Sequence, residues 1–254
     1  MTTHAPTLAA WLALAPFGLT LSSGFFGFFA HAGVVHALAE RHLRPTRISG
    51  SSAGALIGAS WAAGLSPSAI SDRLLDIQKR DFWDPFPGPG LIRGKRFERL
   101  LNDWLPVKTF GECRVPLAVS VYDVLGRRTR VLDSGALAPA IRASCAVPLM
   151  FHPVWMRGRP YLDGGVLDRP GLAGMPCDRV LYHHLSSRSP WRAADGAQTL
   201  IPKRPGLIAL IFDELPRAGP DALDQGVEAY HVALNLMRDA LDRPAPAHVL
   251  RLSA

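Results

Sequence analysis

The stretch Gly50-Ser51-Ser52-Ala53-Gly54 places a serine between two glycines, and a run of small and apolar residues follows it up to Gly64. A serine at this spacing suits a strained turn between a strand and a helix, which exposes a nucleophilic hydroxyl. Small flanking residues allow the sharp turn, and the following helix directs its positive N-terminal end toward an oxyanion. Ser52 is therefore the candidate nucleophile, although the same motif also occurs by chance in tight loops before packed helices.

Composition limits the class of protein. The chain has 254 residues, of which 48% are hydrophobic, enough for the core of one large domain, so we expect a single domain over residues 1–254. Cys113, Cys145 and Cys177 lie far apart, without Cys-x-x-Cys spacing or nearby histidine ligands. This pattern predicts reduced, buried thiols in a cytoplasmic protein, with neither a zinc site nor a disulfide framework.

The charge distribution bears on partners. A net charge of +7 favours contact with an anionic surface such as the periphery of a membrane, although a solvated basic face is the simpler alternative. The basic residues are dispersed and no nucleic-acid-binding motif accompanies them, so nucleic acid is not an expected partner. Residues 1–39 carry no Asp, Glu, Lys or Arg, but Pro16, Ser22-Ser23 and His31 interrupt the span that a bilayer requires. An early positive charge, typical of a secretory signal, is also absent, and whether this region touches membrane stays open.

The order of the expected elements indicates the fold. A buried strand over 17–22, a glycine loop, a helix over 28–41, a strand over 47–49 and a helix over 53–64 alternate along the chain. Such alternation predicts an α/β fold with a mostly parallel sheet and with sites at the carboxyl ends of its strands. Later segments predict further strands and a closing helix: strands 116–121 and 128–132, a hairpin over 153–161, strands 180–184 and 207–212, and a helix over 221–241.

Two segments are ambiguous on their own. Residues 81–94 mix aromatic residues with prolines and glycines, which predicts a long loop, either a flap that admits lipid or a loop folded on its own aromatic side chains. Asp163-Gly164-Gly165 is a second site candidate, but without other support it is more typical of a turn that needs positive φ.

Taken together, three segments resemble the patatin-like phospholipase family over about residues 18–175. They are Ser23-Gly24-Phe25-Phe26-Gly27-Phe28, the serine motif, and Asp163-Gly164-Gly165, in the family's order and spacing. The sequence that leads to Asp163, from Asp133-Ser134-Gly135 through Ala146-Val147-Pro148 to Tyr161, is also similar to that of the family. The resemblance implies a three-layer α/β/α fold with a mostly parallel central sheet. It also implies a serine hydrolase of lipid esters, a phospholipase A, lysophospholipase or esterase, that needs no metal or cofactor.

The resemblance further assigns roles. Ser52 attacks an ester carbonyl, Asp163 accepts its proton, and the acyl-enzyme then passes to water or to an alcohol. A free aspartate, with a pKa of about 3.9, is a weak base, so the site must be partly desolvated and activity must fall on the acid side. The oxyanion hole is expected to be formed by Ser23, Gly24, Phe25 and Ala53. The motif glycines are Gly50, Gly54, Gly164 and Gly165.

One segment departs from the family. Its loop commonly reads Gly-Gly-Gly-x-Arg-Gly, whereas here only Gly24 of the four glycines remains and Gly27 stands in the basic position. Ser and Phe keep their N–H groups but reach fewer φ/ψ values, so activity or acyl preference is expected to differ from the family's. The loop's phenylalanines either wall an acyl pocket or pack in the core: Phe25, Phe26, Phe28 and Phe29.

Two alternatives remain. An α/β-hydrolase triad would recruit one of the histidines that follow Asp163, but in that fold the serine normally follows several strands. A non-catalytic lipid-binding module would explain the altered loop, although it would not explain why both Ser52 and Asp163 are present. His31 is interpreted as a hydrogen-bonded core residue, and Cys145 as a small packed one. The histidines that suit a triad are His183, His184, His231 and His248. Head group, chain length and oligomeric state are not set by the sequence.

Overall fold

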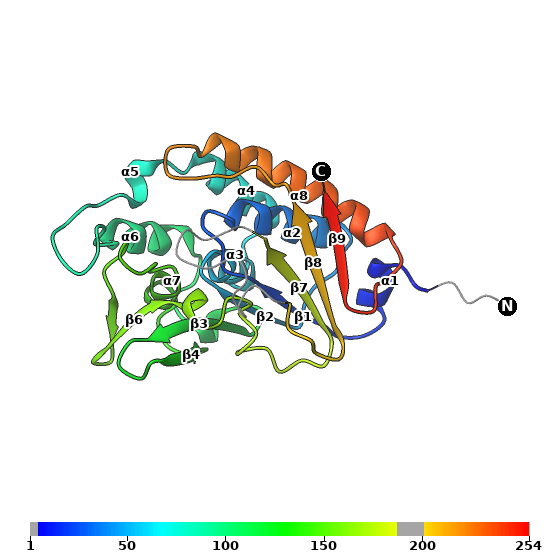
Figure 1. Ribbon diagram of the computed structural model, residues 1–254, viewed down its shortest axis with the longest axis horizontal. Helices are drawn as coiled ribbons and strands as arrows, with labels where there is room; N and C mark the ends of the chain where they lie inside the picture. The colour runs from blue at the N-terminus through cyan, green and yellow to red at the C-terminus, as the bar shows by residue number, and fades with distance from the viewer. Residues whose placement is uncertain (1–4, 187–200, 254) are drawn as a thin grey trace.

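A nine-stranded sheet forms the centre of the computed structural model, which describes residues 5–186 and 201–253 (Figure 1). The strand order is β5-β6-β3-β2-β1-β7-β8-β9, with β4 paired to β3. The strands are β1 Gly18–Leu21, β2 Arg47–Ser51, β3 Leu117–Asp123, β4 Arg128–Leu132, β5 Val154–Met156, β6 Arg159–Asp163, β7 Val180–Leu185, β8 Leu207–Asp213 and β9 Val249–Ser253. The pairs from β3 through β2, β1, β7 and β8 to β9 are parallel, and those made by β4, β5 and β6 are antiparallel. The predicted α/β class with a mostly parallel sheet is confirmed.

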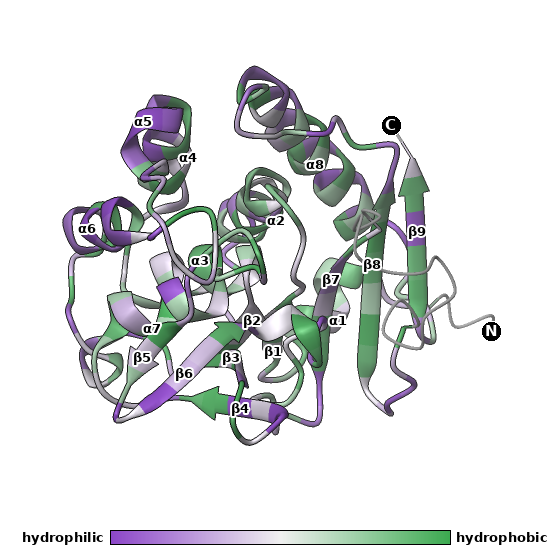
Figure 2. Ribbon diagram, turned by 60° about the vertical axis from the view of Figure 1, so that its left-hand side comes forward, coloured by the Kyte–Doolittle hydropathy of each residue, from purple (hydrophilic) through white to green (hydrophobic). Residues whose placement is uncertain are grey.

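Four helices lie in a row on one face of the sheet, in the order α8, α2, α3, α7 (Figure 2). Because α2 and α3 lie between the sheet and other helices, residues on most of their faces are buried. The helices are α1 Leu8–Ala13, α2 Phe28–Glu40, α3 Ala53–Ala62, α4 Pro67–Asp76, α5 Lys79–Phe82, α6 Lys95–Trp104, α7 Leu137–Ser144 and α8 Asp224–Asp242, with 3-10 turns η1 Phe110–Glu112 and η2 Gly164–Val166. In the described part of the chain no helix is long and apolar enough to span a bilayer.

Side chains alternate across the sheet, as the period of a strand requires. On β7, Leu181 and Leu185 join the main core under the helices, whereas Val180 and Tyr182 join a smaller core on the opposite face. That second core is covered by the connection between η2 and β7, which contributes Leu172, Met175 and Cys177.

Three details differ from the sequence predictions. Residues 79–82 form the short helix α5, so the expected loop begins after Phe82; a capping box between Gln78 and Asp81 stabilises this turn. Strand β9 was not predicted, because Val249–Ser253 alternates weakly and has only Leu252 buried. The three cysteines are free, as expected, but partly exposed rather than buried.

The topology brings the loops of interest to one edge. β1 and β7 are neighbours, yet the chain leaves β1 toward β2 and leaves β7 toward β8, on opposite sides. Ligands of open α/β sheets bind at the carboxyl ends of strands beside such a switch point. The loop over 22–27 follows β1 and Ser52 follows β2, so both lie at this edge.

Candidate active site

The nucleophile turn has a strained backbone. β2 ends at Ser51 and α3 begins at Ala53, and Ser52 between them adopts φ 53° and ψ −118°. A non-glycine residue in such a region costs about 1–3 kcal/mol and persists only where the surroundings enforce it. Here they do: a Cβ on Gly54 would lie 2.0 Å from the Leu21 carbonyl oxygen, so the backbones of β1 and α3 touch. Ser52 is 9% exposed.

A serine that the sequence analysis missed anchors this turn. The Ser52 N–H donates to Ser144 Oγ at 2.8 Å, and the Ser144 hydroxyl donates to the Ser120 carbonyl at 2.7 Å. Ser120 Oγ in turn donates to Asp168 at 2.6 Å. The only sequence signal for Ser144 is a polar residue at the end of the apolar helix α7, and such a buried hydroxyl requires partners.

Asp163 ends β6 and is buried beside the same strands. β2 pairs with β3 through Ser51 and Ser120, and β3 pairs with β6 through Val121 and Asp163. The Asp163 N–H donates to the Ala146 carbonyl at 2.9 Å, and its Oδ1 accepts from the N–H of Gly165 at 2.7 Å. The carboxylate is thereby held at the start of η2.

The two glycines after Asp163 occupy positions where a side chain would collide with neighbouring atoms. Neither has positive φ, so the interpretation of this segment as a positive-φ turn is wrong. A Cβ on Gly164 would lie 2.1 Å from the Ser120 carbonyl oxygen and 2.8 Å from Ser51 Oγ. A Cβ on Gly165 would lie 2.2 Å from Ser23 Oγ. The Asp-Gly-Gly turn therefore packs directly against both the nucleophile turn and the loop after β1.

Cys145 lies between the turn at Ser52 and the aspartate Asp163. Its Sγ donates to the Ser52 carbonyl at 3.3 Å. Burial and the Asp163 carboxylate raise the pKa of the Cys145 thiol well above its usual value. The thiol is thus protonated, consistent with a packing residue rather than a nucleophile.

One of the four N–H groups predicted to bind an oxyanion is already engaged in a hydrogen bond. The Ser23 N–H already donates to the Arg169 carbonyl at 2.8 Å, so the expectation that Ser23 supplies a donor is corrected. Among the residues that the structure describes, the N–H groups of Gly24, Phe25 and Ala53 have no acceptor. Ala53 is the first residue of α3, where an N–H lacks an intrahelical partner.

The loop's phenylalanines divide between core and surface. Phe29 is fully buried, and Phe26 packs against Phe82 of α5 with the rings tilted by 60° and their centroids 5.8 Å apart. Phe25 packs edge-on against Phe26 at 4.8 Å and is itself exposed. Of the loop's four phenylalanines, Phe25 is therefore the one that is exposed.

A buried histidine pair supports the loop after β1. His31 Nδ1 and His183 Nδ1 are 2.8 Å apart, and His31 Nε2 is 2.8 Å from the Ser22 carbonyl. Because a carbonyl only accepts, His31 Nε2 donates to it and His31 Nδ1 accepts from His183. Burial lowers the pKa of His31 to about 4 and that of His183 well below its usual value, so both are neutral. The interpretation of His31 as a hydrogen-bonded core residue is confirmed.

The other histidines have partners outside the site. His184 Nδ1 is 2.7 Å from the Tyr182 hydroxyl, and burial lowers its pKa to about 4. His248 contacts the Leu207 carbonyl, and His231 lies on α8 against Tyr230. Within the described ranges no histidine hydrogen-bonds to Ser52.

With this geometry in place, comparison with known proteins decides the family. Residues 19–174 match the model of the Patatin family, described as patatin-like phospholipase. The chain belongs to the patatin-like phospholipase family. An uncharacterized NTE family protein of Mycobacterium tuberculosis is 30% identical over 191 residues, which cover 70% of this chain and 51% of that protein. The neuropathy target esterase sws of Drosophila grimshawi is 25% identical over 174 residues, which cover 65% of this chain and 12% of that one. The chain thus spans about half the length of its mycobacterial relatives.

Two solved structures are also similar over about half of their own length. VipD from Legionella pneumophila aligns with a TM-score of 0.48 and 17% identity, over 83% of this chain and 52% of that one. ExoU, in its complex with SpcU from Pseudomonas aeruginosa, aligns with a TM-score of 0.47 and 16% identity, over 89% of this chain and 52% of that one.

Proposed function

We propose that this protein hydrolyses ester bonds of lipids as a serine acyl hydrolase, with Ser52 as nucleophile and Asp163 as base. The observation that supports the proposal is that three segments pack together: the turn at Ser52, the loop after β1, and the turn at Asp163-Gly164-Gly165. Gly164 packs on Ser51, Gly165 packs on Ser23, and Cys145 contacts Ser52 within electrostatic reach of Asp163. Family membership independently supports acyl hydrolysis of lipids as the general class of reaction.

In the proposed reaction Ser52 Oγ attacks the ester carbonyl while its proton passes to the Asp163 carboxylate. The carbonyl oxygen becomes an oxyanion, which accepts hydrogen bonds from the N–H groups of Gly24, Phe25 and Ala53. Collapse of this intermediate breaks the ester bond, and the leaving alkoxide takes the proton from Asp163. Water then repeats the sequence on the acyl-enzyme and releases the fatty acid; an alcohol in place of water would give acyl transfer.

The test is hydrolysis of a short-chain p-nitrophenyl ester by variants of the dyad. Ser52→Ala and Asp163→Asn are each expected to lose about 1,000-fold or more in kcat/KM while remaining folded. Ser51→Ala is the matched control, because the neighbouring Ser51 hydroxyl is buried without a hydrogen-bond partner among the described residues. Its activity stays near that of the unsubstituted chain. Full activity in either dyad variant would refute the assignment.

The same assay separates the dyad from a histidine triad. A triad requires that one of four single substitutions abolishes turnover, whereas a dyad permits only modest losses. These are substitutions of His183, His184, His231 and His248. A chain that releases no acyl group from any ester would be the non-catalytic lipid-binding module.

A further inference from the structure

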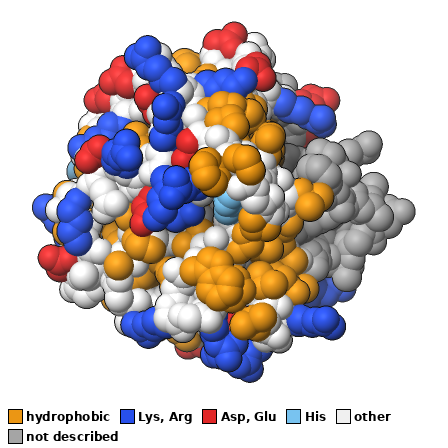
Figure 3. Space-filling view, turned by 90° about the vertical axis from the view of Figure 1, so that its left-hand side faces the viewer, with side chains coloured by type: hydrophobic (Ala, Val, Ile, Leu, Met, Phe, Trp, Pro, Cys, Tyr) orange, Lys and Arg blue, Asp and Glu red, His pale blue; other side chains and the backbone are white. Residues whose placement is uncertain are grey.

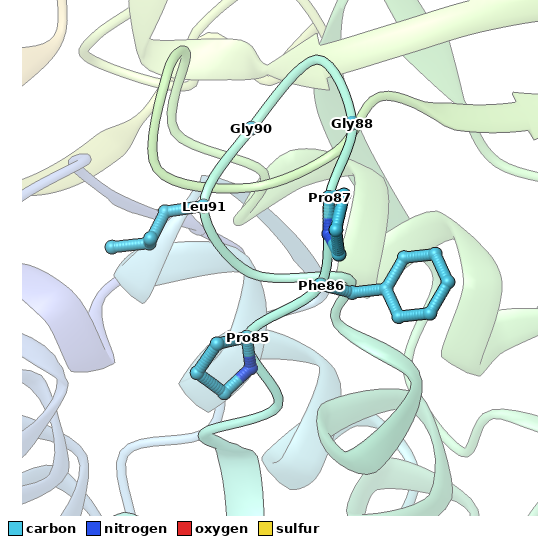
Figure 4. Close-up of a pocket in the computed structure, with 6 residues that line it drawn as sticks. All are labelled: Pro85, Phe86, Pro87, Gly88, Gly90 and Leu91. Carbon is cyan, nitrogen blue, oxygen red and sulfur yellow. The ribbon is translucent and has the colours of Figure 1, made fainter.

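Exposed apolar side chains cluster on two segments that pair beside the site. The loop over 83–94 hydrogen-bonds to residues 149–152: Leu91 N–H donates to the Leu149 carbonyl at 3.1 Å, and Ile92 N–H to the Met150 carbonyl at 2.7 Å. On this double segment Phe86 is 52%, Leu91 55% and Leu149 69% exposed. We name these three side chains, with the prolines 87 and 89 between them, the apolar ridge. Figure 4 shows Phe86 and Leu91 extending from opposite sides of the loop. The loop lines a shallow, open hollow of about 350 Å³.

Leu149 is the most informative residue of the ridge. It adopts φ 67°, a left-handed backbone that a leucine avoids, and at the same time presents its side chain to solvent. Neither property stabilises the isolated protein. An exposed leucine with a strained backbone is explained if a partner molecule buries its side chain.

The apolar ridge is continuous with the proposed active site. Residues 149–152 begin two residues after Ala146, whose carbonyl accepts from the Asp163 N–H, and Ala146 itself follows Cys145, which contacts Ser52. Phe26 of the oxyanion loop packs against Phe82, immediately before the loop over 83–94. Figure 3 faces the side on which this loop projects in Figure 1, and there hydrophobic side chains form a band with Lys and Arg around it.

The charges around the ridge favour an anionic partner. Arg93 lies over the Phe86 ring at 5.0 Å and has no carboxylate partner within the described part of the chain. The nearby acids are already engaged: Asp84 accepts from the first N–H groups of α6, and Glu98 pairs with Arg142 at 2.6 Å. Apolar side chains bordered by an arginine without a carboxylate partner suit the boundary between acyl chains and anionic headgroups.

We propose that the apolar ridge docks this protein on an anionic phospholipid surface, with Leu149, Leu91 and Phe86 entering the acyl-chain boundary and Arg93 contacting headgroup phosphates. This proposal rests on the proposed function, because docking at the ridge presents a lipid ester to Ser52. Docking itself needs no catalysis and can be measured separately.

The experiment measures binding to vesicles with the full chain carrying Ser52→Ala, so that lipid is not consumed. Vesicles of phosphatidylcholine alone are compared with vesicles that also contain phosphatidylglycerol. We expect binding to the anionic vesicles, weakened by salt, and about tenfold weaker binding for Leu149→Asn and for Leu91→Asn. Asparagine tolerates left-handed backbone, so Leu149→Asn is expected to keep or raise the melting temperature.

Leu14→Asn is the matched control. Leu14 is also 69% exposed, but it caps α1, which lies at the opposite end of the molecule from the loop in Figure 1. It is expected to bind anionic vesicles like the parent chain. With Ser52 intact, the ridge variants are expected to hydrolyse a soluble short-chain ester at the parent rate and to lose activity only on vesicles.

Each other outcome is decisive. No binding to anionic vesicles, equal binding by the ridge variants, or an equal loss in Leu14→Asn would overturn the docking surface. A shift from dimer to monomer in Leu149→Asn without loss of vesicle binding would also overturn it, because a second copy would then cover the ridge. Vesicle binding through the ridge without any ester hydrolysis would leave the surface standing and refute the enzyme.

Discussion

The nucleophile turn and the oxyanion loop lie side by side but are held in different ways. At the nucleophile turn, glycines face backbone atoms: a Cβ on Gly54 would meet the Leu21 carbonyl oxygen at 2.0 Å. At the loop over 22–27, a Cβ on Gly27 would lie 2.2 Å from Leu185 Cδ1, the end of a flexible side chain, whereas the nearest backbone atom, the Gly24 carbonyl oxygen, would lie 3.4 Å away. The first region is fixed by backbone packing, and the second has neighbours that can move.

This difference explains where the chain departs from its family. In the serine motif and in Asp-Gly-Gly, a side chain on Gly50, Gly54 or Gly164 would collide with backbone, and one on Gly165 would collide with the Ser23 side chain. In the loop, Ser23 and Phe25 replace glycines without collision, since Ser23 packs on Gly165 and Phe25 extends to the surface. Packing therefore constrains the sequence more tightly at the turn around Ser52 than at the loop over 22–27.

The comparison predicts a large difference between two glycine substitutions. Gly54→Ala is expected to lower the free energy of unfolding by about 3 kcal/mol or more, because backbone must shift. Gly27→Ala is expected to cost only about 1 kcal/mol, because Leu185 can change rotamer. Denaturant unfolding measures both. Equal losses would show that the two regions are equally rigid.

A smaller effect tests the anchor of the nucleophile turn. Ser144→Ala leaves the Ser52 N–H without its acceptor, so we expect kcat to fall up to about 100-fold while KM changes little. Ser60→Ala is the control: Ser60 is equally buried and donates to the Leu56 carbonyl at 2.8 Å, away from Ser52. It should lower stability and spare kcat. Parallel effects of the two substitutions would remove the positioning role from Ser144.

The smallest effect concerns the support of the oxyanion loop. The folded state holds His31 neutral, with its pKa lowered to about 4, whereas the unfolded chain titrates near 6.5. The unfolded state therefore binds more protons between these values, and stability that is complete above pH 6.5 is lost as the pH falls toward 4. Between pH 7.5 and 5 the loss due to His31 is at most about 2 kcal/mol.

Substitution identifies the source of this pH dependence. His31→Gln keeps a donor for the Ser22 carbonyl but removes the titrating ring, so the slope of unfolding free energy against pH should become shallower. His42→Gln, at an exposed position, should leave the slope unchanged. An identical slope in both variants would assign the acid sensitivity to other groups.

Much of the fold follows from local sequence. The strand at Arg128–Leu132 was predicted at its observed bounds, and α2 to within a residue, because their periodicity and breakers are strong. β9 was missed because its existence depends on pairing with β8 rather than on its own pattern. α5 was missed because prolines and glycines close behind it dominate the segment.

The site was predictable in part. Ser52 is recognisable locally, but Asp163 was connected to it only through the family resemblance, since the pairing of β2, β3 and β6 is long-range. Ser144 and the His31–His183 pair were not predicted as supports of the site, because their partners lie far away in sequence. The occupied N–H of Ser23 depends on Arg169, which sequence alone does not place.

The most direct test of the central claim is covalent labelling by a fluorophosphonate probe, with the modified peptide identified by mass spectrometry. We expect a stoichiometric adduct on Ser52, none in Ser52→Ala, and much slower labelling in Asp163→Asn. The Ser51→Ala control should be labelled like the unsubstituted chain. No adduct, an adduct on another residue, or an unchanged rate in Asp163→Asn would contradict the proposed dyad.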